Sequence, residues 1–512
     1  FILMKLYSII GSSGNFIVTI FVAEQADIHL QPYPGTDGAL AWGMIRVLVK
    51  EDLVDHEFID KWCVGYEELV KYCERFTPEY VEKETGVPAE KMVAAARMFA
   101  DGPSAMQLPG QSVPHQHNGC NNVRAMSLLM ALTGNAEKAG ASSIANWPKD
   151  YIRWDEGYTR TFIDEPWFRE EKQRKTRIDR EFAPIWNEMQ VLCSPNNLPE
   201  MVKEGRIRAF CGWGANLLIW PSPQEYQEAV RNMDFSFSTD YFYRDETHHD
   251  MDFVLPAAMN FERYAPFGVH GRKVSARRPV KPLGEAKEDW RIAFEIGCIV
   301  DKPEHFFDGD PVKACDFVLR QYEGCNWDDF AAALPKISVL PAPKPASKKY
   351  ELGRLRPDGK PGFNTQSGKL DFASERARKF GYPAIPEFRP MMPLSKEFDL
   401  RLLNGSRKPY ITHSKTRTDQ PYLMEIEDAL TININPKEAQ KRGIREGDWV
   451  EIRSPYGGPV EARACVSIIV PEGMIDAQYG WLGKQNTQTL MTREHRDPMS
   501  GYCCYFEVPV SV

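Results

Sequence analysis

Hydrophobic and polar positions over the first 146 residues follow a helical period that short extended runs interrupt. Residues 26–31 form one such run, and we expect a helix after the turn that follows it, with Asp37 as the helix cap. Another helix is predicted from Thr77, where proline occupies the next position, to Gly86. Helices and buried strands that alternate at this spacing predict a doubly wound sheet, so we expect residues 1–146 to form a first α/β unit.

The pattern after residue 146 divides the rest of the chain into four segments. Apolar runs at 206–211, 235–243 and 253–258 have the length of strands in a second α/β unit. Strict alternation at 449–453 and 460–466, on either side of a Tyr-Gly-Gly turn, predicts a β-hairpin. We therefore expect a surface insertion over 147–200, a second α/β unit over 201–331, a proline-rich linker and crossing segment over 332–400, and a small all-β barrel over 401–512.

Composition and charge exclude several classes of protein. The 512 residues carry 63 Lys and Arg against 71 Asp and Glu, a net charge of −8 that disfavours binding to nucleic acid. Nowhere does an uninterrupted apolar stretch reach the length of a transmembrane segment. The 11 cysteines are dispersed without a Cys-x-x-Cys pair, so no iron–sulfur or zinc motif is visible, and a reducing, cytoplasmic compartment is favoured.

Two short motifs carry candidate chemistry, and each has an ordinary structural alternative. Gly212 and Gly214 follow the expected strand 206–211, where they indicate either a tight turn or a backbone site for phosphate. A dense group of ligand-type side chains occupies 248–252, with two histidines and two aspartates. Because neighbouring residues of an extended segment point to opposite sides, we interpret these histidines as solvated loop residues and Asp252 as a turn or cap residue.

Polar residues also gather on three loops between apolar strands, at 116–119, 284–290 and 404–414. Each loop alone is compatible with an ordinary protein surface. Together they predict a large polar ligand held between domains.

A series of motifs then follows in a recognisable order along nearly the whole chain. They are Ala26-Asp27 with Pro34-Gly35-Thr36-Asp37, Gln116-His117 to Leu132-Thr133-Gly134-Asn135, Trp213-Gly214-Ala215-Asn216, Ser238-Thr239-Asp240, Glu246-Thr247 to Pro256-Ala257, Gly284-Glu285-Ala286 to Asp289-Trp290, Ile434-Asn435-Pro436, Gly447-Asp448-Trp449-Val450, and Asn486 before Asp497-Pro498. In these motifs the chain resembles the molybdenum or tungsten bis-pterin guanine dinucleotide enzymes of the dimethyl sulfoxide reductase type. The resemblance implies two dinucleotide-binding-like α/β units, each holding the guanosine end of one pterin, and a C-terminal double-psi barrel that caps the pterins.

The resemblance also implies cofactor contacts for three groups of residues. One nucleotide would be contacted by Gly35, Thr36 and Asp37, with Gln116 near the pterin. The other nucleotide end would be held by Asn216, Thr239, Asp240, Arg263 and Asp289, and the barrel would contribute Gly405, Arg407, His413, Ser414 and Asn486. These residue types suit the ligand, because carboxylates accept N–H groups of guanine while Arg, Asn and backbone amides donate to phosphate and pterin oxygens.

Candidate catalytic residues lie just after the pterin-side motif. His117 and Arg124 would assist the substrate as cations or proton carriers, or alternatively belong to the hydrogen-bond network of the pterin. No residue is assigned as a metal ligand, because the cysteine-rich N-terminal part of such enzymes and its metal ligand have no counterpart here. A 4Fe-4S cluster is expected only in that missing region, in a truncated part of the chain or in another subunit.

The resemblance thus predicts the catalytic chain of a molybdenum- or tungsten-dependent oxidoreductase that transfers an oxygen atom, a hydroxyl group or a hydride to or from a small substrate. An iron–sulfur electron-transfer subunit is the expected partner. Two alternatives stay open: a non-redox hydratase or hydroxytransferase of the same superfamily, and a scaffold protein that has lost the metal. The sequence identifies neither the substrate nor the metal.

Overall fold

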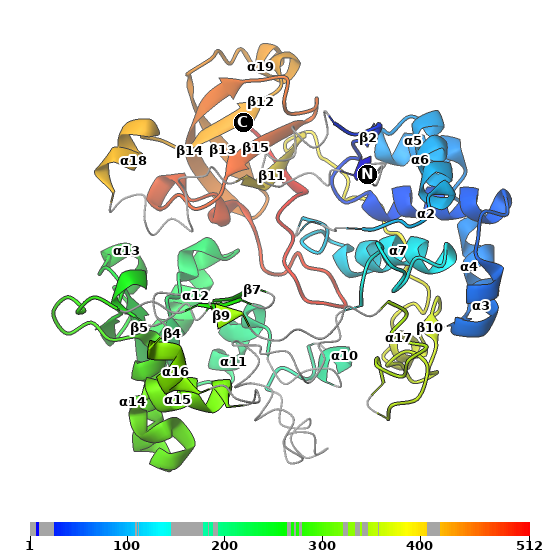
Figure 1. The fold of residues 1–512 in the computed structure, drawn as a ribbon. Helices are drawn as coiled ribbons and strands as arrows, with labels where there is room; N and C mark the ends of the chain where they lie inside the picture. The colour runs from blue at the N-terminus through cyan, green and yellow to red at the C-terminus, as the bar shows by residue number, and fades with distance from the viewer. Residues whose placement is uncertain are drawn as a thin grey trace.

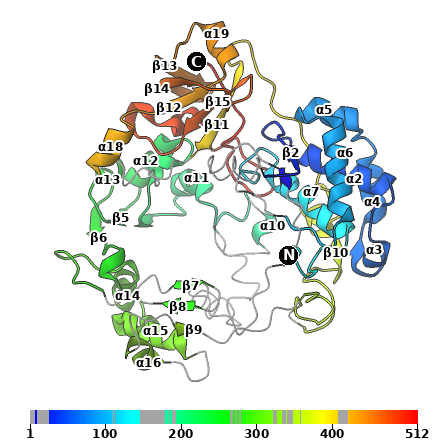
Figure 2. The same ribbon diagram turned by 45° about the horizontal axis from the view of Figure 1, so that its top comes forward.

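The chain folds into three bodies placed around a common centre, as the computed structural model shows (Figures 1 and 2). A helical body contains the N-terminal third, an α/β body follows, and a β-sheet body ends the chain. The structure describes residues 7–9, 25–107, 110, 112–144, 178–182, 184–187, 193–263, 268–270, 273–275, 279–320, 326–332, 338–339, 347–356, 358–406 and 420–512. Most of the expected insertion at 147–200 therefore lies outside the described residues.

The helical body is built around one long buried helix, α2. Its elements are β1 (Tyr7–Ile9), β2 (Ile28–Leu30), α2 (Asp37–Lys50), α3 (His56–Trp62), β3 (Cys63–Val64), α4 (Tyr66–Cys73), α5 (Pro78–Thr85), α6 (Ala89–Asp101) and α7 (Gly119–Leu132). Strand β2 pairs in parallel with β1, and β3 pairs in parallel with β10 (Leu370–Asp371). The described strands of this body thus form two-stranded sheets, and a doubly wound sheet here stays a prediction.

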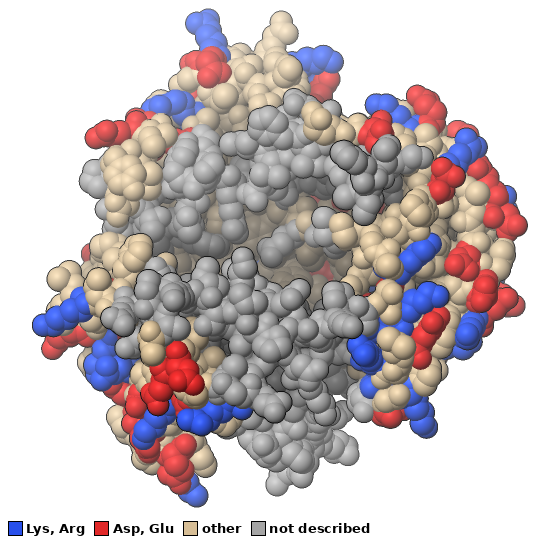
Figure 3. Space-filling view, viewed as in Figure 1, with Lys and Arg blue, Asp and Glu red and all other residues tan. Residues whose placement is uncertain are grey.

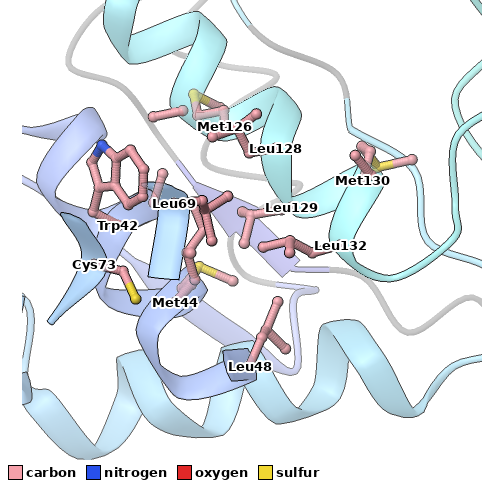
Figure 4. Close-up of a cluster of buried hydrophobic side chains, with 14 of the residues drawn as sticks. Trp42, Met44, Leu48, Leu69, Cys73, Met126, Leu128, Leu129, Met130 and Leu132 are labelled. Atoms are coloured by element: carbon pink, nitrogen blue, oxygen red, sulfur yellow. The ribbon is translucent and has the colours of Figure 1, made fainter. Parts of the chain in front are cut away.

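Helix α2 is central because it is apolar on almost every side, so that it can be buried by several helices at once. Trp42 stacks on Phe76 at 5.7 Å between ring centroids, and Leu129 of α7 packs in the same cluster (Figure 4). Gly38 permits the close crossing of α2 and α7, since a Cβ there would lie 2.3 Å from Oδ1 of Asn122.

Two expected helix ends are confirmed and one expected cap is wrong. Thr77 caps α5 by accepting a hydrogen bond from the Tyr80 amide, and Gly86 ends it in the left-handed conformation. Asp37, however, is the first residue of α2 and does not cap it; the cap position belongs to Thr36. The Asp37 carboxylate points inward instead, where it accepts a hydrogen bond from Gln116 in the loop that precedes α7.

The α/β body contains a parallel three-stranded sheet in the order β4-β5-β6, with Cys211 beside Phe237 and Phe237 beside Phe253. Its elements are α10 (Pro184–Asn187), α11 (Leu198–Lys203), β4 (Ala209–Trp213), α12 (Pro223–Arg231), β5 (Phe235–Asp240), α13 (Asp245–His248), β6 (Phe253–Pro256), β7 (Gly268–His270), β8 (Lys273–Ser275), α14 (Asp289–Val300), α15 (Pro311–Leu319), α16 (Trp327–Ala332) and β9 (Ser338–Val339). The three expected strands are present, although β4 begins later than expected. The amides of Arg206 and Ile207 still bond to the Met201 carbonyl at the end of α11.

A crossing segment connects this body back to the helical body before the final sheet begins. It contains β10 and α17 (Glu375–Lys379). Over residues 383–389 its carbonyls accept hydrogen bonds from four side chains of the helical body, those of Trp42, His117, Asn118 and Arg124. The segment is therefore held against α2 and α7 rather than hanging as a loose linker.

The C-terminal body is a six-stranded mixed sheet in the order β13-β14-β12-β15-β11-β16. Its elements are β11 (Leu400–Ser406), α18 (Pro421–Ile426), β12 (Thr431–Ile434), α19 (Pro436–Arg442), β13 (Trp449–Ser454), β14 (Gly457–Val466), β15 (Met474–Gln478) and β16 (Val508–Val510). The expected hairpin is confirmed, because β13 and β14 pair antiparallel around Pro455 and Tyr456. Residues 486–507 leave this sheet and run between the other two bodies (red in Figure 1).

Acidic and basic side chains are interspersed over the described surface in Figure 3, without a large area of one sign on that face. Among the described residues, none of the helices combines the length and the apolar character needed to cross a bilayer.

Candidate functional site

The N-terminal ends of α2 and α7 are tied together by a buried polar contact. Gln116 Nε2 donates to Asp37 Oδ2 at 2.6 Å, and Gln116 Oε1 accepts from Asn122 Nδ2 at 2.7 Å. Thr36, Asp37 and Gln116 are all buried. Burial raises the pKa of Asp37 to about 6, although the hydrogen bond from Gln116 acts in the opposite direction. The structure therefore brings together three of the residues expected on the first nucleotide side.

His117 lies beside this contact and pairs with a carboxylate that the sequence interpretation missed. Its Nδ1 is 2.6 Å from Glu507 Oε2, and its Nε2 is 3.1 Å from the Arg389 carbonyl oxygen. Burial lowers the pKa of His117, but the hydrogen bond and charge of Glu507 outweigh burial and raise it overall. A glutamate inside the apolar run 505–510 was the available signal, since such a residue is buried only with a partner.

Arg124 occupies a different place from His117. Its guanidinium donates to Asn121 Oδ1 and to the carbonyls of Pro383 and Ala384. Burial lowers the pKa of Arg124. The side chain thus fastens the crossing segment to α7, and a catalytic part for Arg124 stays a prediction.

Residues expected on the second nucleotide side gather at the carboxyl ends of β4 and β5. Thr239 Oγ1 donates to Asp289 Oδ1 at 2.6 Å, and Arg263 Nη1 lies 3.6 Å from Asp289 Oδ2. Asn216 lies three residues after the end of β4, and its side chain accepts a hydrogen bond from the Leu218 amide. Ligands bind at this edge in parallel α/β sheets. Gly214 adopts a left-handed conformation there, so the turn is tight, and a phosphate site at it stays a prediction.

The expected solvated position of His248 is wrong. His248 ends α13 and is 1% exposed, with Nδ1 accepting the Arg244 amide and Nε2 3.3 Å from Asp240 Oδ2. Residues 245–248 form one helical turn, which buries His248 and leaves His249 exposed. The interpretation of this segment as extended could not predict that difference. Asp252 lies at the bend that precedes β6, and its carboxylate accepts hydrogen bonds from the amide and hydroxyl of Ser236 on β5.

The C-terminal body contributes the third wall. Asn486 is buried, and its Nδ2 donates to the Leu218 carbonyl at 2.9 Å, which joins this body to the α/β body. Gly405 lies in β11. Arg407, His413 and Ser414 lie outside the described residues. Arg493 also joins the bodies, through Glu225 of α12 and Glu200 of α11.

Several buried polar atoms in these walls have no hydrogen-bond partner within the described part of the chain. They are Oδ1 of Asp37, Nη1 of Arg401, Oδ1 of Asn404, and both amide atoms of Gln488. Burying such groups without a partner costs free energy, so native proteins rarely leave them unsatisfied. The set contains both acceptors and donors, which fits a large ligand that is rich in hydrogen-bonding groups of both kinds. Gln488 was also missed by the sequence interpretation, and no pattern in the sequence marks it.

Comparison with known proteins gives a consistent result. A family model described as Molybdopterin oxidoreductase matches residues 7–298, and one described as Molydopterin dinucleotide binding domain matches residues 400–509. Acetylene hydratase of Syntrophotalea acetylenica is 27% identical over 482 residues, which are 85% of this chain and 62% of that protein. The F420-dependent formate dehydrogenase subunit alpha of Methanocaldococcus jannaschii is 27% identical over 483 residues, 88% of this chain and 65% of that protein.

A solved structure shows the same mixed α/β fold. Acetylene hydratase from Pelobacter acetylenicus superposes with a TM-score of 0.80 at 23% identity, over 96% of this chain and 72% of that one. Against the two relatives by sequence, however, the chain spans less than two thirds of the length of each. The matched models cover all three walls of the candidate site, namely the α2–α7 contact, the ends of β4 and β5, and the C-terminal sheet.

Proposed function

Because the chain belongs to the molybdopterin oxidoreductase family, we propose that it is the cofactor-binding part of a molybdenum- or tungsten-dependent oxidoreductase. Its reaction would be transfer of an oxygen atom, a hydroxyl group or a hydride to or from a small substrate. The observation that carries the proposal is the set of buried polar atoms in the helical and C-terminal bodies that have no hydrogen-bond partner among the described residues. A bis-molybdopterin guanine dinucleotide offers the hydrogen-bonding partners that these atoms require.

In this proposal the three bodies have separate tasks. Residues 1–146 and 201–331 are the two dinucleotide-binding-like units, with 147–200 inserted between them and 332–400 crossing back to the first unit. Residues 401–512 are the double-psi barrel that covers the pterins. The six-stranded mixed sheet and its curled shape are compatible with such a barrel.

The side chains divide the binding work by charge. Asp37, Asp240 and Asp289 are the acceptors for guanine N–H groups, and Oδ1 of Asp37 is available for that purpose. Arg263 and Asn216, at the carboxyl ends of the strands, donate to phosphate oxygens. The barrel residues Gly405, Arg407, His413, Ser414 and Asn486 complete the contacts. When bound, the metal supplies the redox or Lewis-acid chemistry, while the chain binds, orients and excludes water.

His117 and Arg124 supply positive charge on the pterin side of the first unit. His117 has an acceptor at each ring nitrogen, which favours its function as a fixed cation over that of a proton carrier. Because the Glu507 carboxylate neutralises this charge, His117 orders the wall rather than adding net charge to it. Arg124 instead holds the crossing segment against α7.

A non-redox reaction is the second candidate function, and the similarity to acetylene hydratase favours it. The formate dehydrogenase alpha subunit among the relatives instead favours the redox reaction and a partner subunit that exchanges electrons. A cytoplasmic location stays a prediction from the cysteine content.

Elemental analysis of the purified chain for Mo, W and Fe, combined with guanine released by acid, tests the proposal. Metal with one guanine for each of the two pterins is expected. Asp37→Asn should lower the guanine content, whereas Asp60→Asn, on an exposed position of α3, should not. Absence of both metal and guanine from a folded chain would refute cofactor binding and favour the scaffold alternative. Turnover that requires an electron-accepting dye would then identify the redox reaction, and hydration without acceptor the alternative.

A further inference from the structure

Glu507 is a fully buried carboxylate at the point where the C-terminal segment passes the helical body. Its neighbours along the chain are apolar, and strand β16 begins at the next residue. An ionised carboxylate at 0% exposure is tolerated only where charged or hydrogen-bonding partners replace water. The partners of Glu507 therefore indicate what the residue is for.

Both oxygens of Glu507 contact the same residue of the helical body. Oε2 lies 2.6 Å from Nδ1 of His117, and Oε1 accepts from the His117 amide at 2.8 Å. The second ring nitrogen of His117 faces the carbonyl of Arg389 at 3.1 Å. Two acceptors, one at each ring nitrogen, require two ring protons, so the imidazole is held as a cation.

The same carboxylate packs against the turn that leads into α2. Gly35 has a φ of +84°, and a Cβ at this position would lie 2.9 Å from Glu507 Oε2. Glu507 thus fills the space that a side chain at position 35 would take. One carboxylate from the C-terminal body touches both the Gly35 turn and the His117 turn of the helical body.

We propose that Glu507 is a positioning residue, which fixes His117 as a cation and sets the separation of the Gly35 and His117 turns. The Gly35 turn leads into Asp37, and His117 directly follows Gln116, so displacing either turn would move a residue assigned to the cofactor. The consequence for cofactor retention therefore rests on the proposed function. Both members of the charged pair belong to this chain.

The surroundings of Glu507 define its pH behaviour. Besides His117, the groups that act electrostatically with it are Asp37, Arg401, His495 and Cys504. Burial raises the pKa of Glu507, but His117 outweighs burial and lowers it overall. Since the pKa of His117 is raised, the pair is complete between the two pKa values and is lost as the pH rises through that of His117.

Histidine titration by NMR on the whole chain, with carbon-labelled histidine, tests the pairing directly. The chain has 10 histidines, and the resonance absent from His117→Gln assigns the one required. In Glu507→Gln, which retains the shape of the side chain, we expect the His117 pKa to fall by at least about 1 unit. Glu507→Asp should keep it raised if the chain folds, because the charge is retained. Glu472→Gln removes a surface ion-pair partner of Lys437 in the same body and should leave His117 unchanged.

Guanine retained after gel filtration is the second measurement on the same variants. Glu507→Gln should lose guanine several-fold faster than wild type and Glu472→Gln. A His117 resonance that titrates identically in Glu507→Gln and wild type would overturn the positioning function. A shifted His117 pKa with unchanged guanine retention would overturn its consequence for the cofactor. Wild type without guanine would instead refute the proposed function, and the titration would still decide whether Glu507 positions His117.

Discussion

Replacing Asp37 with asparagine separates the cost of a buried carboxylate from its use in binding. Asp37 is buried, and its carboxylate accepts a side-chain hydrogen bond from Gln116, while Oδ1 has no hydrogen-bond partner among the described residues. Asparagine has the same shape, and its carbonyl oxygen can accept the same hydrogen bond. The substitution therefore removes the charge and replaces the second acceptor oxygen with an N–H donor.

The size of the effect follows from the pKa of Asp37, which burial raises from 3.8 to about 6. A difference of about 2 units corresponds to about 3 kcal/mol. Because the folded state binds this proton more tightly than the unfolded state, the wild-type chain loses stability as the pH rises from ~4 to ~6. Without cofactor, Asp37→Asn should thus be close to wild type at pH ~4 and more stable by about 3 kcal/mol at pH ~7.5.

Denaturant unfolding of cofactor-free protein at the two pH values measures this difference. The exposed Asp60→Asn is the matched control and should change stability equally at both. A stability difference between Asp37→Asn and wild type that does not depend on pH would refute the reasoning. The same variant should bind the cofactor about 10-fold more weakly, since a charged acceptor is lost. A more stable but weaker-binding variant would show that the carboxylate is retained for its ligand.

Three further substitutions probe the contacts that hold the site together. Gly35→Ala should cost about 1–3 kcal/mol because of its positive φ and the contact with Glu507; denaturant unfolding measures it, and an unchanged stability would contradict the packing. Arg493→Met should lower the free energy of unfolding by only about 1 kcal/mol, because its partner carboxylates on α11 and α12 are partly exposed. It should also raise amide hydrogen exchange in α12, and unchanged exchange would contradict a stabilising contact between Arg493 and that helix. Leu129→Ala should cost about 2–5 kcal/mol through a cavity beside α2, measured by the same unfolding assay, and a loss below that range would mean that the cluster is loosely packed.

Local signals in the sequence predicted individual elements well where a single residue decides the geometry. A threonine followed by proline began α5, and Gly86 ended it, because capping and left-handed backbone are properties of those residues themselves. Alternation predicted the β13–β14 hairpin for the same reason. Asp37 was mistaken for a cap, since an aspartate near a helix start has two uses, and only the position of Gln116 across the fold decides between them.

Contacts between side chains that are distant along the chain could not be predicted from the sequence. The resemblance correctly indicated the family and grouped Thr239, Arg263 and Asp289, which the structure brings together. It could not indicate that Glu507 pairs with His117, 390 residues earlier, because no local pattern encodes that contact. The prediction for His248 was wrong for a related reason. A polar residue is buried only where it has a partner, here Asp240, and tertiary structure determines which partner lies nearby.

The C-terminal segment explains how three bodies with separate cores can share one site. Within residues 486–507, Asn486 and Arg493 bond to the α/β body. Asp497 accepts from the amide of Cys120 at the start of α7, and Glu507 pairs with His117. A displacement of this segment would therefore move its contacts to the helical body and to the α/β body at once. Under the proposed function we therefore expect substitutions in the segment to weaken the retention of both guanosine ends together, whereas substitutions at Asp37 or Asp289 should act on one end only.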